Sequence, residues 1–230
     1  MFSRLFSKWI ICRGCLRPMS GTGEAGLCAS CWEGLWPLPE ERCPKCALVH
    51  GGNSPCPDKV AWEYGDALWN YRGGRPALGS LLVHGVKAGE TGWRRALLKR
   101  VASAELPAWA GDVDLVTSAP TSFARVWKRG FDLAEDAARI ISGKLGRPYI
   151  QTMKRSLISK RQARLTESQR RRMPRKTIRM RASINVSEKT ILLVDDVWTT
   201  GTTLLRCAET LKASGAKEIR AFSLFRSIQM

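Results

Sequence analysis

The pattern of apolar and polar positions in the second half of the chain predicts strands and helices in alternation. Apolar runs over 114–120, 190–194 and 219–225 have the length of buried strands. The segment 133–146 repeats apolar residues at the spacing of a helix face and ends at a glycine followed by a proline. A second helix is expected over 202–213. Strands that alternate with helices predict a parallel sheet with helices on both faces, which is an α/β fold.

The first half of the chain is less regular. Within 61–111 the pattern predicts a strand over 66–71 and a helix near 92–105, whereas residues 1–60 are rich in Cys, Gly and Pro and have little periodicity. We therefore expect a small cysteine-rich domain over 1–60 and an α/β domain over 61–230. The segment 155–181 is expected to be a long loop with some helical content.

Positive charge is concentrated in one segment of the chain, residues 154–181. The chain carries a formal net charge of +18, and residues 154–181 hold twelve Lys and Arg against one acid, Glu167. Such a balance favours nucleic acid, a phosphorylated ligand or an anionic membrane face as partner, although charge also serves solubility alone. No apolar run reaches the length of a transmembrane helix, and the start, MFSRLFSKWIIC, is too short for a secretory signal. A cytoplasmic protein without a transmembrane segment is expected.

The cysteines indicate bound metal. Seven of the eight lie between Cys12 and Cys56, and without an export signal such pairs are more typical of metal sites than of disulfides. The first two Cys-x-x-Cys units predict a structural zinc site, because four thiolates leave no open coordination position. Its ligands are Cys12, Cys15, Cys28 and Cys31.

A second unit lacks one cysteine. Cys43 and Cys46 form another Cys-x-x-Cys pair and Cys56 follows, but position 59 is a lysine. Asp58 or His50 are candidates for the fourth ligand, and a half without metal is the alternative.

The stretch TILLVDDVWTTGTT (190–203) ends a strand with two adjacent carboxylates, Asp195 and Asp196. In open α/β sheets, ligands bind beyond the carboxyl ends of the strands. The turn Thr199–Thr203 then leads into a helix whose first amides, with the hydroxyls, suit a phosphate. Carboxylates suit ribose hydroxyls or hydrated magnesium. The stretch predicts a sugar-phosphate site; an ordinary helix-entry turn is the alternative.

These residues also resemble a known family. VDDVWTTGTT resembles the PRPP-binding signature of type I phosphoribosyltransferases. The layout from Cys12 to about Arg226 resembles the ComF/GntX family, phosphoribosyltransferase-like proteins linked to DNA uptake in competence, which have an N-terminal double zinc ribbon. The residues that match the rest of the family pattern are Pro120, Arg125, Arg129-Gly130-Phe131, Gln162, Leu165 and Arg170-Arg171-Arg172.

The chain departs from the family pattern at four places. Asp132-Leu133 stands where the family favours Asn-Gln, and Met173 where it often has Asn. Ser118-Ala119 replaces the usual entry to the pyrophosphate loop, and the second ribbon lacks its last cysteine. These departures leave the binding signature complete.

The resemblance implies roles for named residues. Asp195 and Asp196 would be the catalytic pair that orients the ribose hydroxyls, with magnesium bridging pyrophosphate and ribose. The 5′-phosphate would be bound by Thr199, Thr200, Gly201, Thr202 and Thr203. Pyrophosphate would be bound by Ser118, Ala119, Pro120 and Lys87. A basic lid or DNA-binding surface would comprise Lys160, Arg161, Arg164, Arg170, Arg171 and Arg172.

The function implied is that of a PRPP-binding, phosphoribosyltransferase-like protein that handles incoming single-stranded DNA in the cytoplasm during natural transformation. Its partners would be PRPP, single-stranded DNA and a helicase-like competence protein. Turnover of PRPP by a magnesium-dependent transferase is left open, since no residue indicates a base-specific pocket. The alternatives are a nucleobase-salvage phosphoribosyltransferase and a non-catalytic zinc-ribbon DNA-binding protein with a relict PRPP site, in which Trp127 or Trp198 would stack on bases.

Overall fold

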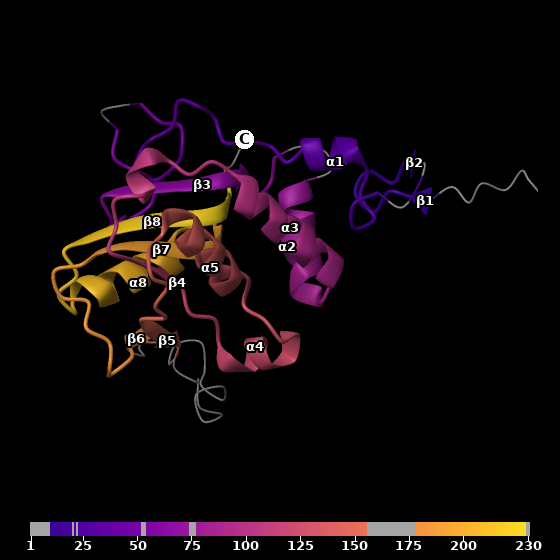
Figure 1. Ribbon diagram of the computed structural model, residues 1–230. Coiled ribbons are helices and arrows are strands. Elements are labelled where there is room, and N and C mark those ends of the chain that lie inside the picture. Colours follow the sequence, from indigo (N-terminus) through magenta and orange to yellow (C-terminus); the bar gives the residue numbers. More distant parts are fainter. Residues whose placement is uncertain are drawn as a thin grey trace, which may run out of the picture.

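A sheet of four parallel strands forms the centre of the molecule, in the order β3-β8-β7-β4 (Figure 1). This computed structural model describes residues 10–19, 21, 23–51, 54–73, 77–155 and 178–228. The strands are β3 (Tyr64–Asn70), β4 (Leu115–Ser118), β7 (Thr190–Trp198) and β8 (Glu218–Arg226). The predicted parallel α/β class is confirmed.

The two central strands are buried on both faces, which explains their nearly continuous apolar sequences. Side chains alternate along β7, so Leu192 and Val194 enter one core while Ile191 and Leu193 enter the other. The sheet therefore separates two hydrophobic cores.

Helices cover both faces, as predicted. One face is covered by α2 (Leu78–Ala88), α3 (Thr91–Ser103) and α5 (Leu133–Leu145), whose buried side chains share the core of Leu192. α8 (Thr202–Lys212) covers the opposite face. A two-stranded antiparallel sheet, β5 (Met153–Arg155) and β6 (Ile178–Met180), lies against α8.

Four helical elements go beyond the sequence prediction, and β6 lies within the segment 155–181 that was expected to be a loop. α2 contains two glycines, which lower helix propensity and hide its pattern. α4 (Phe123–Arg129) is only seven residues long and buries no side chain, so no buried face marks it in the sequence. α1 (Ala29–Glu33) and the 3₁₀ turn Ala108–Ala110 are only a turn or so long.

One strand is longer than predicted. β7 was expected to end at Val194, but it continues to Trp198 because β8 pairs with it to the end, through Trp198 and Arg226. The pairing with β4 does stop at Val194, opposite Ser118. The two aspartates therefore lie inside a strand but beyond the end of its shorter neighbour.

The cysteine-rich segment packs as two separate pieces. The first, with β1 (Ile10–Ile11), β2 (Pro18–Met19) and α1, contacts α3, where Trp93 Nε1 donates to the carbonyl of Ala25 at 2.7 Å. The second shares the core on the opposite side of the sheet, through Cys46 and Trp62. A domain boundary at residue 61, just before β3, stays a proposal.

Two further sequence predictions concern the basic segment and the absence of a transmembrane helix. Residues 156–177 lie outside the described part of the chain, so Lys160, Arg161, Arg164, Arg170, Arg171 and Arg172 are not placed. Among the described residues, no helix combines the length and the apolar character needed to cross a bilayer.

Candidate functional site

The adjacent carboxylates of β7 occupy different environments. Asp195 is buried, with 8% of its surface exposed, and its Oδ1 accepts a hydrogen bond from the backbone N–H of Asp196 at 2.9 Å. Asp196 is partly exposed. Because side chains alternate along a strand, Asp196 lies on the side of Val194 and α5, whereas Asp195 lies on the side of α8. The two are not equivalent ligands.

Burial raises the pKa of Asp195 to about 8, and the neighbouring negative charge of Asp196 adds to the rise. Two like charges this close cannot both ionise without a compensating cation. The protein supplies one of its own, because Lys87 Nζ lies 2.5 Å from Asp196 Oδ2. The structure thus brings together three residues that the sequence analysis assigned to the site.

A third carboxylate, Asp132, belongs to the same cluster. It is the N-cap of α5, where its Oδ1 accepts from the N–H of Ala134 at 3.1 Å. Burial raises the pKa of Asp132, a hydrogen bond from Thr121 opposes the rise, and the charge of Asp196 adds to it. Sequence reasoning missed this role; the available signal was the departure from Asn-Gln at this position.

The turn after β7, here called the threonine loop (Thr199–Thr203), leads directly into α8. Thr199, Thr200 and Thr202 are exposed, and the hydroxyls of Thr200 and Thr202 lie 2.9 Å apart. Gly201 is the N-cap of α8, with φ +68°, and has no side chain that could cap the helix. The first amides of α8 are therefore left for an anion, which the helix dipole also favours.

Gly201 is required for two reasons. Its positive φ strains any other residue type, and a Cβ there would lie 2.8 Å from Nε1 of Trp198. Trp198 is 1% exposed, and its Nε1 has no hydrogen-bond partner among the described residues. The loop thus lies directly on a buried indole.

The residues predicted to bind pyrophosphate differ in availability. Ser118, Ala119 and Pro120 are all buried. The Ser118 hydroxyl donates to Gln151 Oε1 at 2.7 Å, and the N–H of Ala119 donates to the carbonyl of Val194 at 2.8 Å. Within this set only Lys87 presents a partly exposed polar side chain.

A cleft of about 1120 Å³ begins on the other side of the threonine loop, between α8 and β6. Lys59, Arg179 and Arg206 line it, together with Thr200 and Thr202. Asp58 and Glu209 line it as well, so the cleft carries charges of both signs.

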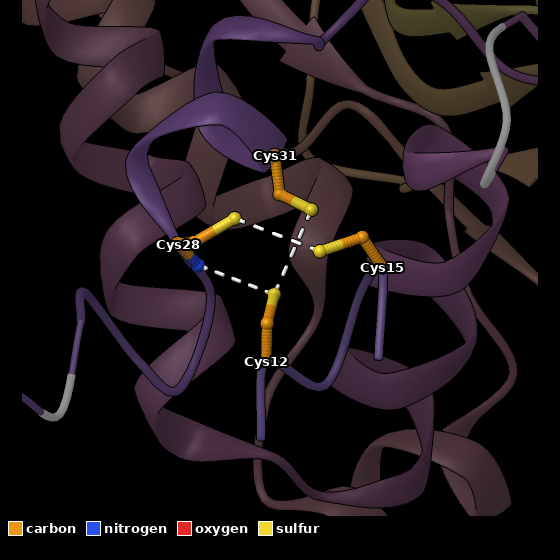
Figure 2. Close-up of side chains that lie close together, drawn as sticks. All are labelled: Cys12, Cys15, Cys28 and Cys31. Carbon is orange, nitrogen blue, oxygen red and sulfur yellow. Dashed lines mark hydrogen bonds between the residues drawn. The ribbon is translucent and has the colours of Figure 1, made fainter. Parts of the chain in front are cut away.

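The first cysteine group (Cys12, Cys15, Cys28 and Cys31) converges on one point (Figure 2). The sulfurs of Cys12 and Cys31 are 3.6 Å apart and those of Cys15 and Cys28 are 3.8 Å apart. Disulfide sulfurs lie at about 2.05 Å, whereas Zn–S bonds of about 2.3 Å give tetrahedral edges of about 3.8 Å. The donor set and spacing fit zinc.

Backbone amides stabilise the thiolate form of Cys12 in this group. The N–H groups of Gly14 and Cys28 donate to Cys12 Sγ at 3.4 and 3.3 Å. Burial opposes ionisation and is the largest single influence, but these amides, with the amide of Cys15 and the Cys28 thiol, together lower the pKa of Cys12 to about 6. Such hydrogen bonds stabilise the charged form that ligates metal.

The second cysteine group (Cys43, Cys46, His50 and Cys56) also converges, with all ligand atoms within 4.8 Å of one another. Cys43 and Cys56 sulfurs lie 3.6 Å apart, and His50 Nε2 lies 3.2 Å from Cys46 Sγ. Of the two fourth ligands considered from the sequence, His50 occupies that position, while Asp58 pairs with Arg226. Three thiolates and an imidazole likewise fit zinc.

The short helix α4 presents aromatic and basic side chains together. Trp127 is 80% exposed and Phe123 is 67% exposed. Four positions apart, they lie on one side of the helix. Arg125 and Lys128 are also exposed, but at two positions and one position from Trp127 they point to other sides of the helix. The helix follows the loop after β4, so this surface lies in sequence directly beyond the residues predicted to bind pyrophosphate.

Comparison with known proteins agrees with this architecture. Residues 121–229 match the family described as Phosphoribosyl transferase domain. The chain is 27% identical over 232 residues to "DNA utilization protein YhgH" of Salmonella typhi, covering 95% of this chain and 97% of the relative. The resemblance to the ComF/GntX family is confirmed by this full-span similarity.

Two solved structures show a weaker similarity to part of the chain. A glutamine PRPP amidotransferase from B. subtilis is 22% identical with a TM-score of 0.39, over 56% of this chain and 25% of that one. This chain thus spans about a quarter of the amidotransferase. A purine phosphoribosyltransferase from Pyrococcus horikoshii is 17% identical with a TM-score of 0.35, over 64% of this chain and 85% of that one.

Proposed function

We propose that this chain binds PRPP with magnesium at the edge of the sheet where β4 ends and β7 continues. The observation that carries the proposal is the convergence of Lys87 with Asp196 beside an uncapped helix start at Gly201. A cation, carboxylates and free amides within one site match the three parts of PRPP: pyrophosphate, ribose and 5′-phosphate.

The residues divide the ligand between them. The threonine loop would hold the 5′-phosphate through its amides and hydroxyls, and Asp196 would accept hydrogen bonds from the ribose hydroxyls. Lys87 would release Asp196 and form an ion pair with the pyrophosphate instead. The backbone near Ser118, Ala119 and Pro120 would also contact the pyrophosphate. Magnesium, when bound, would offset the charge of the pyrophosphate, and the carboxylate cluster suits it. Lys160, Arg161 and Arg164 remain candidates for a lid.

If the bound PRPP reacts, the step is displacement of pyrophosphate from the anomeric carbon by an acceptor. The protein would then have to stabilise the charge that develops on the leaving pyrophosphate, and Lys87 is the described side chain placed for this. The binding role stands without this step, and salvage of a nucleobase is the alternative use of the same site.

A panel of ligands tests the ligand class. Thermal unfolding would be followed with PRPP, ribose 5-phosphate, pyrophosphate or AMP, each with magnesium. PRPP should raise Tm most, because it alone engages all three parts of the site, and a ligand at 100 times its Kd stabilises by about 2.7 kcal/mol. Equal shifts for PRPP and pyrophosphate would contradict the proposal, since they would indicate a general anion effect.

A second function, single-stranded DNA binding, is supported by the exposed surface of α4. Bases stack on exposed aromatic rings while cations contact phosphates. Phe123 and Trp127 offer exposed rings on one side of α4, and Arg125 and Lys128 offer cations on its other exposed sides. The name of the Salmonella relative, DNA utilization protein, supports a role with DNA. In line with the family resemblance, we propose that the chain handles incoming single-stranded DNA in the cytoplasm during natural transformation, with a helicase-like protein as its candidate partner.

Variants of α4 test this second function. Trp127→Ala with Phe123→Ala should weaken binding of a fluorescent single-stranded oligonucleotide about 10- to 100-fold, because each stacked base contributes about 1–3 kcal/mol. Trp36→Ala is the matched control, since Trp36 is also exposed, at 46%, but belongs to the cysteine-rich segment. Equal affinities of the two variants would remove α4 from the account.

We also propose that both cysteine groups bind structural zinc. Each offers four soft ligand atoms within 4.8 Å of one another, which leaves no open coordination position for catalysis.

A further inference from the structure

The second cysteine group is joined to the sheet through the backbone of its own knuckle. The carbonyls of residues 44–46 accept three successive hydrogen bonds: from the N–H of Gly65 at 2.8 Å, from Trp62 Nε1 at 2.7 Å and from Arg226 Nε at 3.0 Å. A Cβ at Gly65 would lie only 2.4 Å from the carbonyl of residue 45, so glycine alone allows this approach.

Arg226 connects this knuckle to the threonine loop. It is the last residue of β8, is 1% exposed, and also donates from Nη1 to the carbonyls of Trp198 at 3.1 Å and Thr199 at 2.5 Å. Its Nη2 contacts Asp58 Oδ2 at 2.5 Å. One guanidinium thus binds the Cys46 carbonyl, a carboxylate of the cysteine-rich segment and the first two carbonyls at the loop entrance.

The surroundings of the guanidinium are closely packed. Its carbon lies 4.5 Å from the centre of the Trp198 ring, and the edge of Trp62 meets that ring at 5.2 Å and 84°. Burial lowers the pKa of Arg226 and the charge of Asp58 opposes this. Only the planar fork of arginine can reach all these acceptors at once, so lysine is not an equivalent residue here.

We propose that Arg226 is a positioning residue that couples metal binding at the second cysteine group to the conformation of the threonine loop. A metal at Cys43, Cys46, His50 and Cys56 fixes the knuckle; the knuckle carbonyl and Asp58 fix Arg226; and Arg226 holds the loop entrance. Loss of that metal loosens the loop. The coupling to ligand affinity rests on the proposed binding of PRPP, whereas the coupling to the loop rests only on the proposed zinc at the second cysteine group.

Reciprocity follows from this arrangement. If metal at the second group strengthens binding of a phosphate ligand at the loop, the ligand must strengthen retention of the metal by the same factor. The first cysteine group has no such link among the described contacts, since it packs on α3. It therefore serves as an internal reference in the same molecule.

The experiment is hydrogen–deuterium exchange, in the zinc-loaded full chain, of two amides that donate to carbonyls of the loop and its entrance: Leu205 N–H to Gly201 and Ser227 N–H to Trp198, both at 2.8 Å. Cys56→Ser, which removes one ligand of the second group, and Arg226→Lys should each speed exchange of these amides about tenfold or more, as expected for local opening. Arg220→Lys is the matched control: Arg220 lies in the same strand, is 7% exposed and binds the carbonyl of Trp109, far from the loop. Its variant should leave the exchange of the loop unchanged.

Asp58→Asn is a milder variant in case the others fail to fold. It removes only the charge that pairs with Arg226 and keeps every backbone acceptor of that residue. It should also speed exchange of the loop, by a smaller factor. Unchanged exchange in Cys56→Ser, Arg226→Lys and Asp58→Asn would overturn the proposal. Faster exchange in Arg220→Lys equal to that in Arg226→Lys would also overturn it, because the effect would then be general destabilisation.

A second experiment, with PRPP present, distinguishes a failure of the proposed coupling from a failure of the proposed PRPP binding. With PRPP and magnesium, release of zinc to a chromophoric chelator should have a slow phase that PRPP slows about tenfold in the wild type but not in Arg226→Lys. Wild-type protein that fails to bind PRPP contradicts the proposed function, while the exchange result still decides the role of Arg226. Binding of PRPP with no effect on zinc release contradicts the coupling alone.

Discussion

Lys87 Nζ lies 2.5 Å from Asp196 Oδ2, which joins the last turn of α2 to the far end of β7. Both side chains are partly exposed, at 31% and 20%, so the pair faces the site and not the core. A lysine in this position balances one of three neighbouring carboxylates and can turn to an incoming anion.

Lys87→Gln should weaken PRPP binding about 10- to 100-fold, because a charge-assisted contact to pyrophosphate is lost. Calorimetric titration with magnesium would measure it. Lys99→Gln on the neighbouring helix α3 is the control, since Lys99 is exposed and away from the cluster. A variant at Lys87 that binds like the one at Lys99 would exclude Lys87 from the site.

Asp195 should make stability depend on pH. Burial, aided by Asp196, raises its pKa to about 8, against about 3.9 in an unfolded chain. Between these values the folded protein retains a proton that unfolding releases, so this contribution to stability is full below about pH 4 and is lost as the pH rises through 8. Relative to Asp195→Asn, the wild type should lose about 1.4 kcal/mol, or ~3–5 °C in Tm, per pH unit between pH 5 and 7.

Thermal unfolding at several pH values checks this, with Asp112→Asn as control because that carboxylate is 94% exposed. Wild type and Asp112→Asn should show the same slope. Parallel curves for wild type and Asp195→Asn would mean that Asp195 is ionised in the folded protein.

Gly201→Ala should cost about 1–2 kcal/mol and abolish PRPP binding while the fold persists, because alanine is strained at φ +68° and meets the Trp198 ring. Gly143→Ala is the matched control: it lies in α5 with open space around its Cα, so it should be neutral or stabilising. Retained PRPP affinity in Gly201→Ala would indicate that the loop is not the phosphate site.

The protein should contain two zinc ions per chain. His50→Ala should lower this to about one, because the second cysteine group would then have three ligands where a structural zinc site needs four. Elemental analysis after dialysis would measure the content. The chain has one other histidine, and His84→Ala is the control because His84 shares a hydrogen bond with Tyr71 and belongs to neither cysteine group. Two zinc ions in His50→Ala would remove the histidine from the second group.

The sequence predicted those parts of the site that depend on local spacing. Asp195, Asp196 and the threonine loop are contiguous, and the first cysteine group has a regular spacing, so periodicity and motif were sufficient. Asp132 was missed because its role depends on the approach of α5 to β7. The contact of Arg226 with Asp58 joins residues 168 positions apart and has no local signal.

The ends of the helices and strands were likewise predicted where local sequence determines them. α5 and α8 were placed within a residue or two because each has a continuous buried face and a clear stop. The end of β7 was misplaced because polar residues, Asp195 and Asp196, occupy strand positions that are paired by β8 alone. A functional site is where local preference and tertiary structure differ most.

The central claim is that the two aspartates serve a bound sugar phosphate. The most direct test is calorimetric titration of the zinc-loaded protein with PRPP, with and without magnesium, repeated on the double variant Asp195→Asn, Asp196→Asn. The account predicts binding that requires magnesium and falls at least 100-fold in the double variant. Binding of PRPP by the folded double variant with wild-type affinity, or no binding by the wild type, would contradict it.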